Sequence, residues 1–168
     1  MSAYLLSVAS FAVVSHGDQK RKYTGEPYAS HPLDVAALVA TVVQDEEVLG
    51  GAIIHDLFED TDATEEDALA VCGPKAVRIA KRLTNVPVEP GLNRDKRKAL
   101  DRERLAAGNW EEQTVKVADL ICNAPSTRDN DPVFAAKYKK EAQALLDVLI
   151  LADLTLRGKL SAILATLP

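Results

Sequence analysis

Apolar residues recur at helical spacing along this chain, and Gly and Pro residues separate one run from the next. Residues 3–16 show the pattern clearly, because Leu5, Val8 and Ala12 fall on one face of a helix. We find no run that alternates between apolar and polar residues as a half-buried strand does. Aromatic residues make up only 5% of the chain, so Ala, Leu, Val and Ile must fill most of the core. These features predict an all-α fold.

We expect a single domain of about eight to ten helices over residues 1–168, since one ordinary domain has about this length and no internal repeat is present. Capping residues and helix breakers place the boundaries. The expected helices are 3–16, 31–43, 46–59, a short one after Thr64, one from Gly73-Pro74 to about Leu83, 93–107, 110–124, 132–151 and a last one capped by Asp153. Residues 85–91, with two prolines, are expected to form a loop.

The bulk properties exclude several classes of protein. A net charge of −5 argues against a nucleic-acid-binding surface, because phosphate backbones are held mainly by clustered Lys and Arg. The apolar start has no basic segment of the kind that begins a signal peptide, and no apolar run is long enough to span a bilayer. Cys72 and Cys122 match no paired metal-binding spacing and are expected to be buried free thiols. We therefore expect a cytoplasmic protein with no membrane or nucleic-acid partner.

The segment GAIIHDLFEDT, residues 51–61, places four ionisable side chains in an apolar stretch. In one continuous helix, His55 would lie beneath Glu59 and Asp56 beneath Asp60, so that one face would present an imidazole and three carboxylates. Burying such groups without partners costs roughly several kcal/mol each. A bound cation would satisfy them, and a His/Asp set without thiolates suits Mn²⁺, Mg²⁺ or Fe²⁺.

Two neighbouring ligands cannot surround an ion, so further ligands must come from other segments. His31, in ASHPLDVAAL, and Asp119, in VKVADLICN, are the best candidates, because each lies among apolar or small residues. Taken alone, each residue is equally compatible with a helix cap or a hydrogen-bonded core position.

The order His31, His55-Asp56 and Asp119 resembles the metal-binding signature of the HD phosphohydrolase superfamily. More narrowly, GEPYASHP, HDLFEDT and VKVADLICN are similar to three motifs of the Rel/SpoT stringent-response hydrolase domain and of the stand-alone small alarmone hydrolases. The resemblance runs from about Ser2 to Leu151. It implies an all-helical, Mn²⁺-dependent enzyme that removes pyrophosphate from the 3′ position of guanosine tetra- and pentaphosphate. Because the chain ends soon after this region, we expect a hydrolase without a synthetase domain.

The same resemblance implies a role for individual residues. His31, His55, Asp56 and Asp119 would be the metal ligands, and Glu59 and Asp60 would stand beside the attacking water. A carboxylate there can orient the water or take its proton. The structural alternative for the acidic pair is a solvated helix end.

The substrate contacts implied by the resemblance lie in three segments. The basic loop 20–22 contributes Arg21 and Lys22, although three such charges alone are usually solvated surface. Asn123 matches a nucleotide-binding position of the family, and Ser126 stands where a hydroxyl residue usually follows. Tyr138 matches a tyrosine that faces the phosphates, and its alternative is a half-buried helix residue.

One departure puts some of these contacts in doubt. Pro125 stands where the family often carries an Arg, so base or phosphate contacts would differ, and Arg128 could compensate. The charged stretch 93–104 is expected to be an exposed helix, with Arg97 or Lys98 reaching the substrate only as a minor alternative.

Two other functions remain compatible with these residues. The first is a phosphatase with the same metal site acting on another nucleotide, such as an adenosine alarmone or an NADPH-like dinucleotide. The second is a nucleotide-binding module without catalysis, although such a protein would be expected to have lost ligands or the acidic pair. The partner in each case is a small nucleotide.

Overall fold

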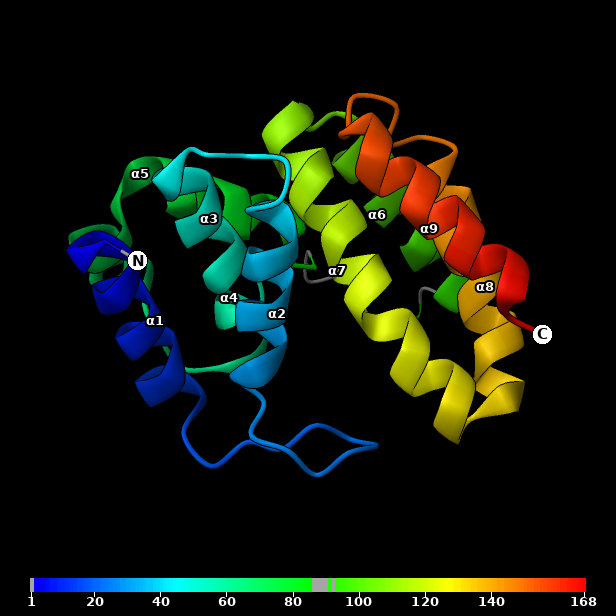
Figure 1. Ribbon diagram of the computed structural model, residues 1–168, viewed down its shortest axis with the longest axis horizontal. Helices are drawn as coiled ribbons and strands as arrows, with labels where there is room; N and C mark the ends of the chain where they lie inside the picture. Colours follow the sequence, from blue (N-terminus) through cyan, green and yellow to red (C-terminus); the bar gives the residue numbers. More distant parts are fainter. Residues whose placement is uncertain (1, 86–90, 92) are drawn as a thin grey trace. The chain divides into compact units, whose positions relative to one another are not determined.

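The computed structural model describes residues 2–85, 91 and 93–168 and is all-helical, as expected (Figure 1). Nine helices occur within these residues, and their only β pairing is an isolated bridge between Lys20 and Pro27. The helices are α1 (Ala3–His16), α2 (Ser30–Val39), α3 (Glu46–Ile53), α4 (Leu57–Asp60), α5 (Glu65–Leu83), α6 (Arg94–Ala106), α7 (Trp110–Asn130), α8 (Pro132–Leu146) and α9 (Leu154–Thr166). Most of the loop expected over residues 85–91 lies outside the described residues.

The chain divides into two compact units, Met1–Thr84 and Asn85–Pro168. In the first unit, α3 is flanked by α1 and α2 and packs on α5 (Figure 1). Two glycines of α3 permit this packing. A Cβ atom on Gly51 would lie 2.8 Å from Ile79 of α5, and one on Gly50 would collide with the Tyr4 hydroxyl of α1. This close approach fixes the end of α3, which leads directly into residues 54–56.

The expectation of an unbroken helix over residues 46–59 is wrong. Helix α3 ends at Ile53, residues 54–56 form a turn, and the short α4 follows. The Ala52 carbonyl accepts a hydrogen bond from the His55 ring at 2.8 Å, whereas in a continuous helix it would accept from the Asp56 N–H. His55 and Asp56 therefore lie in a turn between helices. Asp56 caps the start of α4, and its carbonyl accepts from the Asp60 N–H at 3.0 Å.

The helix starts agree well with the expected capping residues. The Thr64 side chain accepts from the Asp67 N–H, and Asp153 accepts from Thr155 and Leu156. The expected break at Gly73-Pro74 is a kink inside α5, where Gly73 has a φ of 76°.

The helix ends agree less well with the expectations. Helix α2 ends at Val39 rather than 43, and α8 ends at Leu146 rather than 151. Helix α7 continues past Pro125. The hydroxyl groups of Ser126 and Thr127, which follow this proline, both donate to the carbonyl of Asn123, which precedes it.

In the second unit, α7 packs against α8 and α9, while α6 contacts α7 and α8. Helix α7 is buried along most of its first half, and leucines of α9 are buried in the same unit. Buried Gln113 donates to the carbonyls of Ala106 and Gly108 and accepts from the Leu151 N–H, so it ties the turn before α7 to the segment after α8. This network fixes the helix that carries Asp119.

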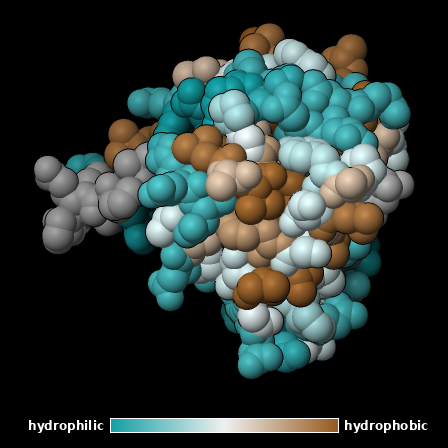
Figure 2. Space-filling view, turned by 90° about the vertical axis from the view of Figure 1, so that its left-hand side faces the viewer, coloured by the Kyte–Doolittle hydropathy of each residue, from teal (hydrophilic) through white to brown (hydrophobic). Residues whose placement is uncertain are grey.

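The predicted apolar face of α1 is buried at Leu5, Val8 and Ala12. Val13 and Val14 of α1 are exposed. Figure 2 shows apolar residues among polar ones on one side of the protein. Within the described part of the chain, no helix is both long enough and apolar enough to cross a membrane.

Candidate metal centre

Three of the four predicted metal ligands lie together in the first unit. His31 belongs to the first turn of α2, whereas His55 and Asp56 lie in the turn between α3 and α4. Both imidazole rings are buried, with 2% and 1% of their surface exposed, and their centroids are 5.2 Å apart. One ligand atom from each of the three residues lies within 4.8 Å of the others. We call this group the His31–His55–Asp56 cluster.

The hydrogen bond of His55 to the backbone determines which ring nitrogen faces the cluster. A carbonyl oxygen only accepts, so Nδ1 of His55 carries the proton that it donates to Ala52. Nε2 of a neutral His55 then presents a lone pair. Histidines that bind metals in proteins are usually oriented by such a bond from the other ring nitrogen.

Asp56 Oδ2 lies at the centre of the cluster, 3.1 Å from His55 Nε2 and 3.5 Å from His31 Nε2. When His55 is neutral, its lone pair and the carboxylate oxygen repel each other at this distance. Either a proton on Nε2 or a shared cation removes that repulsion. Imidazole nitrogen and carboxylate oxygen without thiolate are suitable donors for a divalent first-row ion or Mg²⁺. The residues therefore fit a divalent metal.

Tyr28 also belongs to this group, although our sequence analysis did not single it out. Its hydroxyl donates to Asp56 Oδ2 at 2.7 Å, and its ring is edge-on to His31 with centroids 5.9 Å apart. The position of Tyr28 in GEPYASHP, one helical turn before His31, was the available signal. Spacing alone could not show that its hydroxyl reaches a residue 28 positions away.

Glu59 and Asp60 are exposed at the end of α4. The carboxylates of Asp56 and Asp60, together with burial, raise the pKa of Tyr28 well above its ordinary value, with burial the largest cause. Asp60 is thus among the charged groups near the Tyr28 hydroxyl.

The basic loop lies in the first unit and is closed by backbone hydrogen bonds. The Arg21 N–H donates to the Glu26 carbonyl at 2.9 Å, and the Lys20–Pro27 bridge forms the base of the loop. Lys22 is exposed, and its ammonium lies 4.7 Å from the centroid of the Tyr23 ring. Arg21 is half-buried.

Asp119, the fourth predicted ligand, is buried in the middle of α7 in the second unit. Lys116 Nζ lies 2.7 Å from its Oδ2, and Asn123 Nδ2 donates to its Oδ1 at 2.7 Å. The structure thus brings together two predicted site residues, Asp119 and Asn123. Lys116 was missed, although its position three residues before Asp119 places both on one face of α7.

Tyr138 and Ser126 lie in the same unit. The Tyr138 hydroxyl donates to the Leu120 carbonyl at 2.6 Å, and burial raises its pKa well above the ordinary value, with a further contribution from Asp119. The Ser126 hydroxyl donates to the Asn123 carbonyl. Both hydroxyls are engaged by the backbone, so a substrate contact from either one would replace or share an existing hydrogen bond.

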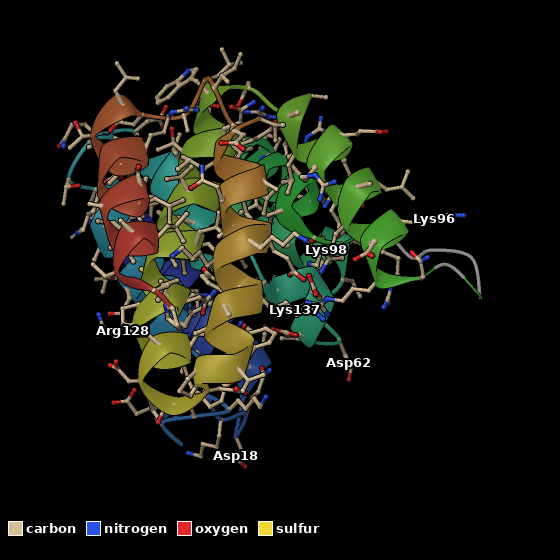
Figure 3. All side chains as sticks on the ribbon, turned by 90° about the vertical axis from the view of Figure 1, so that its right-hand side faces the viewer. Asp18, Asp62, Lys96, Lys98, Arg128 and Lys137 are labelled. Carbon is tan, nitrogen blue, oxygen red and sulfur yellow. The ribbon has the colours of Figure 1, made fainter. Side chains whose placement is uncertain are left out.

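Most charged side chains of α6 are exposed or half-buried, as expected of an outer helix. Helix α6 buries only Leu105, and Lys96 projects away from it (Figure 3). Arg128 is exposed beyond Pro125 and pairs with its neighbour Asp129 at 2.7 Å. Cys122 is half-buried rather than buried, Cys72 is buried, and neither forms a disulfide in the described structure.

The comparisons with known proteins agree with this site. The family model described as "HD domain" matches residues 9–148. The chain is 31% identical to guanosine-3′,5′-bis(diphosphate) 3′-pyrophosphohydrolase MESH1 of Drosophila melanogaster over 78% of this chain and 73% of that protein. It is 42% identical to the guanosine-3′,5′-bis(diphosphate) 3′-pyrophosphohydrolase of Aquifex aeolicus over 45% of this chain, but this match spans only 11% of that protein.

A solved structure gives the same result. The structure described as a metazoan ortholog of SpoT that hydrolyzes ppGpp has a TM-score of 0.86 and 28% sequence identity, covering 98% of this chain and 96% of the other. These matches confirm the resemblance expected from the motifs, and the HD fold with its histidine–aspartate cluster points to a divalent metal. The chain therefore belongs to the HD domain family.

Proposed function

We propose that this protein is a (p)ppGpp 3′-pyrophosphohydrolase, with one Mn²⁺ ion held by His31, His55, Asp56 and Asp119. The observation that carries the proposal is the gathering of two imidazole nitrogens and one carboxylate oxygen in the His31–His55–Asp56 cluster. Asp119 is included because it stands in the motif VKVADLICN, and Mn²⁺ because the donor set suits it. The names of the MESH1 relatives and of the SpoT ortholog support the reaction and the substrate.

A bound divalent cation lowers the pKa of a water molecule and offsets negative charge on the phosphoryl group. The side chains of the protein supply the remaining functions. Asp60 or Glu59 accepts a proton from the water as its oxygen bonds to the phosphorus next to the ribose. The bond between that phosphorus and the ribose 3′ oxygen breaks, and the 3′ oxygen takes up the proton from the carboxyl group or from solvent as pyrophosphate is released. Asp60 is one turn of α4 after Asp56 and lies near the Tyr28 hydroxyl, and this position favours Asp60 for the contact with the water.

The substrate is a small anionic nucleotide, and cationic and amide groups are proposed to hold it. Arg21 and Lys22 contribute charge from the basic loop, while Asn123, Ser126 and Tyr138 are the proposed contacts from the second unit. A charge-assisted hydrogen bond from Arg or Lys to a phosphate is about twice as strong as a neutral one. The cytoplasmic location rests on the sequence alone.

The decisive assay measures pyrophosphate release by metal-stripped protein, with and without added Mn²⁺. Guanosine tetraphosphate, an adenosine alarmone and NADPH are compared at equal concentration. We expect Mn²⁺-dependent release that is fastest with guanosine tetraphosphate. Faster turnover of another nucleotide would show that guanosine tetraphosphate is not the preferred substrate and would leave the proposed metal site unchanged. Binding of a nucleotide without turnover would indicate a non-catalytic module.

Two variants test the assigned residues in the same assay. His55→Ala should lower turnover by about 100-fold or more, since even outer partners of metal ligands are worth about 10- to 100-fold. Asp60→Asn should lower turnover by about 10²- to 10⁴-fold, the usual contribution of a general base. Asp62→Asn is the matched control, because Asp62 is exposed two residues further on and points outwards (Figure 3). Equal activity in D60N and D62N would remove Asp60 from the mechanism.

A further inference from the structure

Tyr28 is held in place by contacts from three directions. Its N–H donates to the Gln19 carbonyl at 2.8 Å, at the base of the basic loop. Its ring packs on buried His16 of α1, with centroids 4.9 Å apart, and meets His31 of α2 edge-on. His16 is fixed in turn, because its Nδ1 donates to the Gln19 side chain at 2.8 Å. The direction of the Tyr28 ring is thus determined by α1, α2 and the loop between them.

The hydroxyl of Tyr28 meets the cluster at one particular atom. It donates to Asp56 Oδ2, and this is the same oxygen that lies 3.1 Å from His55 Nε2 and 3.5 Å from His31 Nε2. A phenol hydroxyl donates and an ionised carboxylate oxygen only accepts, so the proton of this hydrogen bond belongs to Tyr28. A carboxylate oxygen has a second lone pair, which leaves Oδ2 able to bind a cation at the same time.

Asp56 differs from the two histidines in how it is held. His55 is oriented by its own hydrogen bond to Ala52, and both imidazoles are almost completely buried. The Asp56 side chain is 20% exposed and lies in a turn rather than in a helix. A carboxylate in such a position can rotate towards solvent unless a partner holds it. The Tyr28 hydroxyl is such a partner.

We propose that Tyr28 is a positioning residue, whose hydroxyl holds Asp56 Oδ2 at the point where the nitrogens of His31 and His55 meet. The proposal rests on the divalent-metal site of the proposed function and adds a residue to it. Tyr28 touches neither the substrate nor the reacting atoms in this role. It sets the affinity for the metal by keeping the carboxylate in its binding orientation before the ion arrives.

The test compares the Mn²⁺ affinity of Tyr28→Phe and Tyr4→Phe in the full chain. The two substitutions are matched, because each removes one hydroxyl hydrogen bond of 2.7 Å from a half-buried tyrosine of the first unit. Tyr4 donates to the Cys72 carbonyl and lies outside the cluster. Free Mn²⁺ is measured by electron paramagnetic resonance during titration of metal-stripped protein. We expect Y28F to bind Mn²⁺ about 10- to 100-fold more weakly, and Y4F to bind within about twofold of the unchanged protein.

Pyrophosphate release as a function of Mn²⁺ concentration provides a second measurement. If Tyr28 is a positioning residue, Y28F should need a higher Mn²⁺ concentration for half-maximal activity, by the same factor as its loss of Mn²⁺ affinity. Most of the maximal rate should return at saturating Mn²⁺. Circular dichroism in chelator gives the folded state of each variant. A Y28F protein without helical signal would assign Tyr28 a merely structural role and overturn the proposal.

The remaining outcomes separate this proposal from the proposed function. Equal Mn²⁺ affinity in Y28F and Y4F would overturn the role of Tyr28 and leave the metal site intact. If Y28F binds Mn²⁺ more weakly but the unchanged protein releases no pyrophosphate from guanosine tetraphosphate, the role of Tyr28 is supported and the proposed substrate is wrong. No Mn²⁺ binding by the unchanged protein would overturn both.

Discussion

Tyr4 and Cys72 form a partly buried contact between α1 and α5. The Tyr4 hydroxyl donates to the Cys72 carbonyl at 2.7 Å. Burial raises the pKa of the Cys72 thiol from 9.0 to about 11. Burial, followed by the Cys72 thiolate and nearby carboxylates, raises the pKa of Tyr4 from 10.0 to about 12. Both groups are therefore held in their neutral forms by folding, and this links the stability of the first unit to alkaline pH.

The sign of this linkage gives a prediction for Cys72→Ala. Below about pH 9 the thiol is neutral in both states, whereas between about pH 9 and 11 it ionises only in the unfolded chain and stabilises that chain. The free energy of unfolding of the unchanged protein, relative to C72A, should fall by about 1–2 kcal/mol between about pH 8 and 10.5. Urea titrations of both proteins at each pH measure it. A difference that stays constant with pH would contradict the raised pKa.

Some site residues could be found in the sequence because they are close in the chain or stand in recognisable segments. His55 and Asp56 are adjacent, and His31 begins a helix after a loop with clear breakers. The directions in which the Tyr28 and His55 side chains point could not be predicted from the sequence. Tyr28 reaches Asp56 only because the loop brings its backbone to Gln19. The tautomer of His55 likewise depends on the hydrogen bond from its Nδ1 to the Ala52 carbonyl, which is available because α3 ends at Ile53.

At the scale of the elements, helix starts were predictable and helix ends were not. A start is marked by a side chain that caps free N–H groups, and Thr64, Asn93, Asn109 and Asp131 each accept a hydrogen bond there. An end depends on what the last carbonyls and side chains contact in the folded chain. The break after Ile53 shows this, since the apolar spacing through residues 46–59 is helical throughout. Helical spacing therefore predicted the faces of the helices better than their lengths.

The capping box at the start of α7 supports a prediction for Asn109→Ala. The Asn109 side chain accepts from the Glu112 N–H at 3.0 Å, and the buried Glu112 carboxylate accepts from the Asn109 N–H at 2.9 Å. Loss of the Asn side chain should lower the free energy of unfolding by about 1–2 kcal/mol. The activity of the folded fraction should be unchanged, because Asp119 lies more than two turns further along α7.

The matched control for N109A is Asn130→Ala at the other end of the same helix. Asn130 is exposed and donates to the Ser126 carbonyl, so its loss should change stability by less than about 0.5 kcal/mol. Thermal unfolding followed by circular dichroism compares the two variants. Equal stability in N109A and N130A would show that the capping box adds nothing beyond a surface hydrogen bond.

At the scale of the whole molecule, the proposed ligands belong to both compact units. His31, His55 and Asp56 lie within Met1–Thr84, and Asp119 lies within Asn85–Pro168. The residues matched by the HD domain family run through both units. The expectation of a single domain over residues 1–168 stays a prediction. It requires both units to unfold in one transition, and it can be tested because the second unit has a reporter of its own.

Trp110, the only tryptophan of the chain, stands at the start of α7 and reports on the second unit. Mn²⁺ at about 100 times its dissociation constant should stabilise the protein by about 2.7 kcal/mol, which raises the Trp110 transition by roughly 5–10 °C. Asp119→Asn should lose most of this increase if Asp119 is a ligand. Asp129→Asn, an exposed residue of the same helix, should keep it.

For each variant, the temperature of the Trp110 transition in Mn²⁺ is compared with its value in chelator. The loss of the contact between Asp119 and Lys116 affects both values and so cancels from the difference. Circular dichroism recorded on the same samples reports both units together. If the Trp110 and circular dichroism transitions coincide, and Mn²⁺ does not raise the unfolding temperature of D119N, one metal ion couples the units through Asp119. If D119N keeps the full shift, Asp119 serves only its bonds to Lys116 and Asn123, and the cation is held by the His31–His55–Asp56 cluster without it.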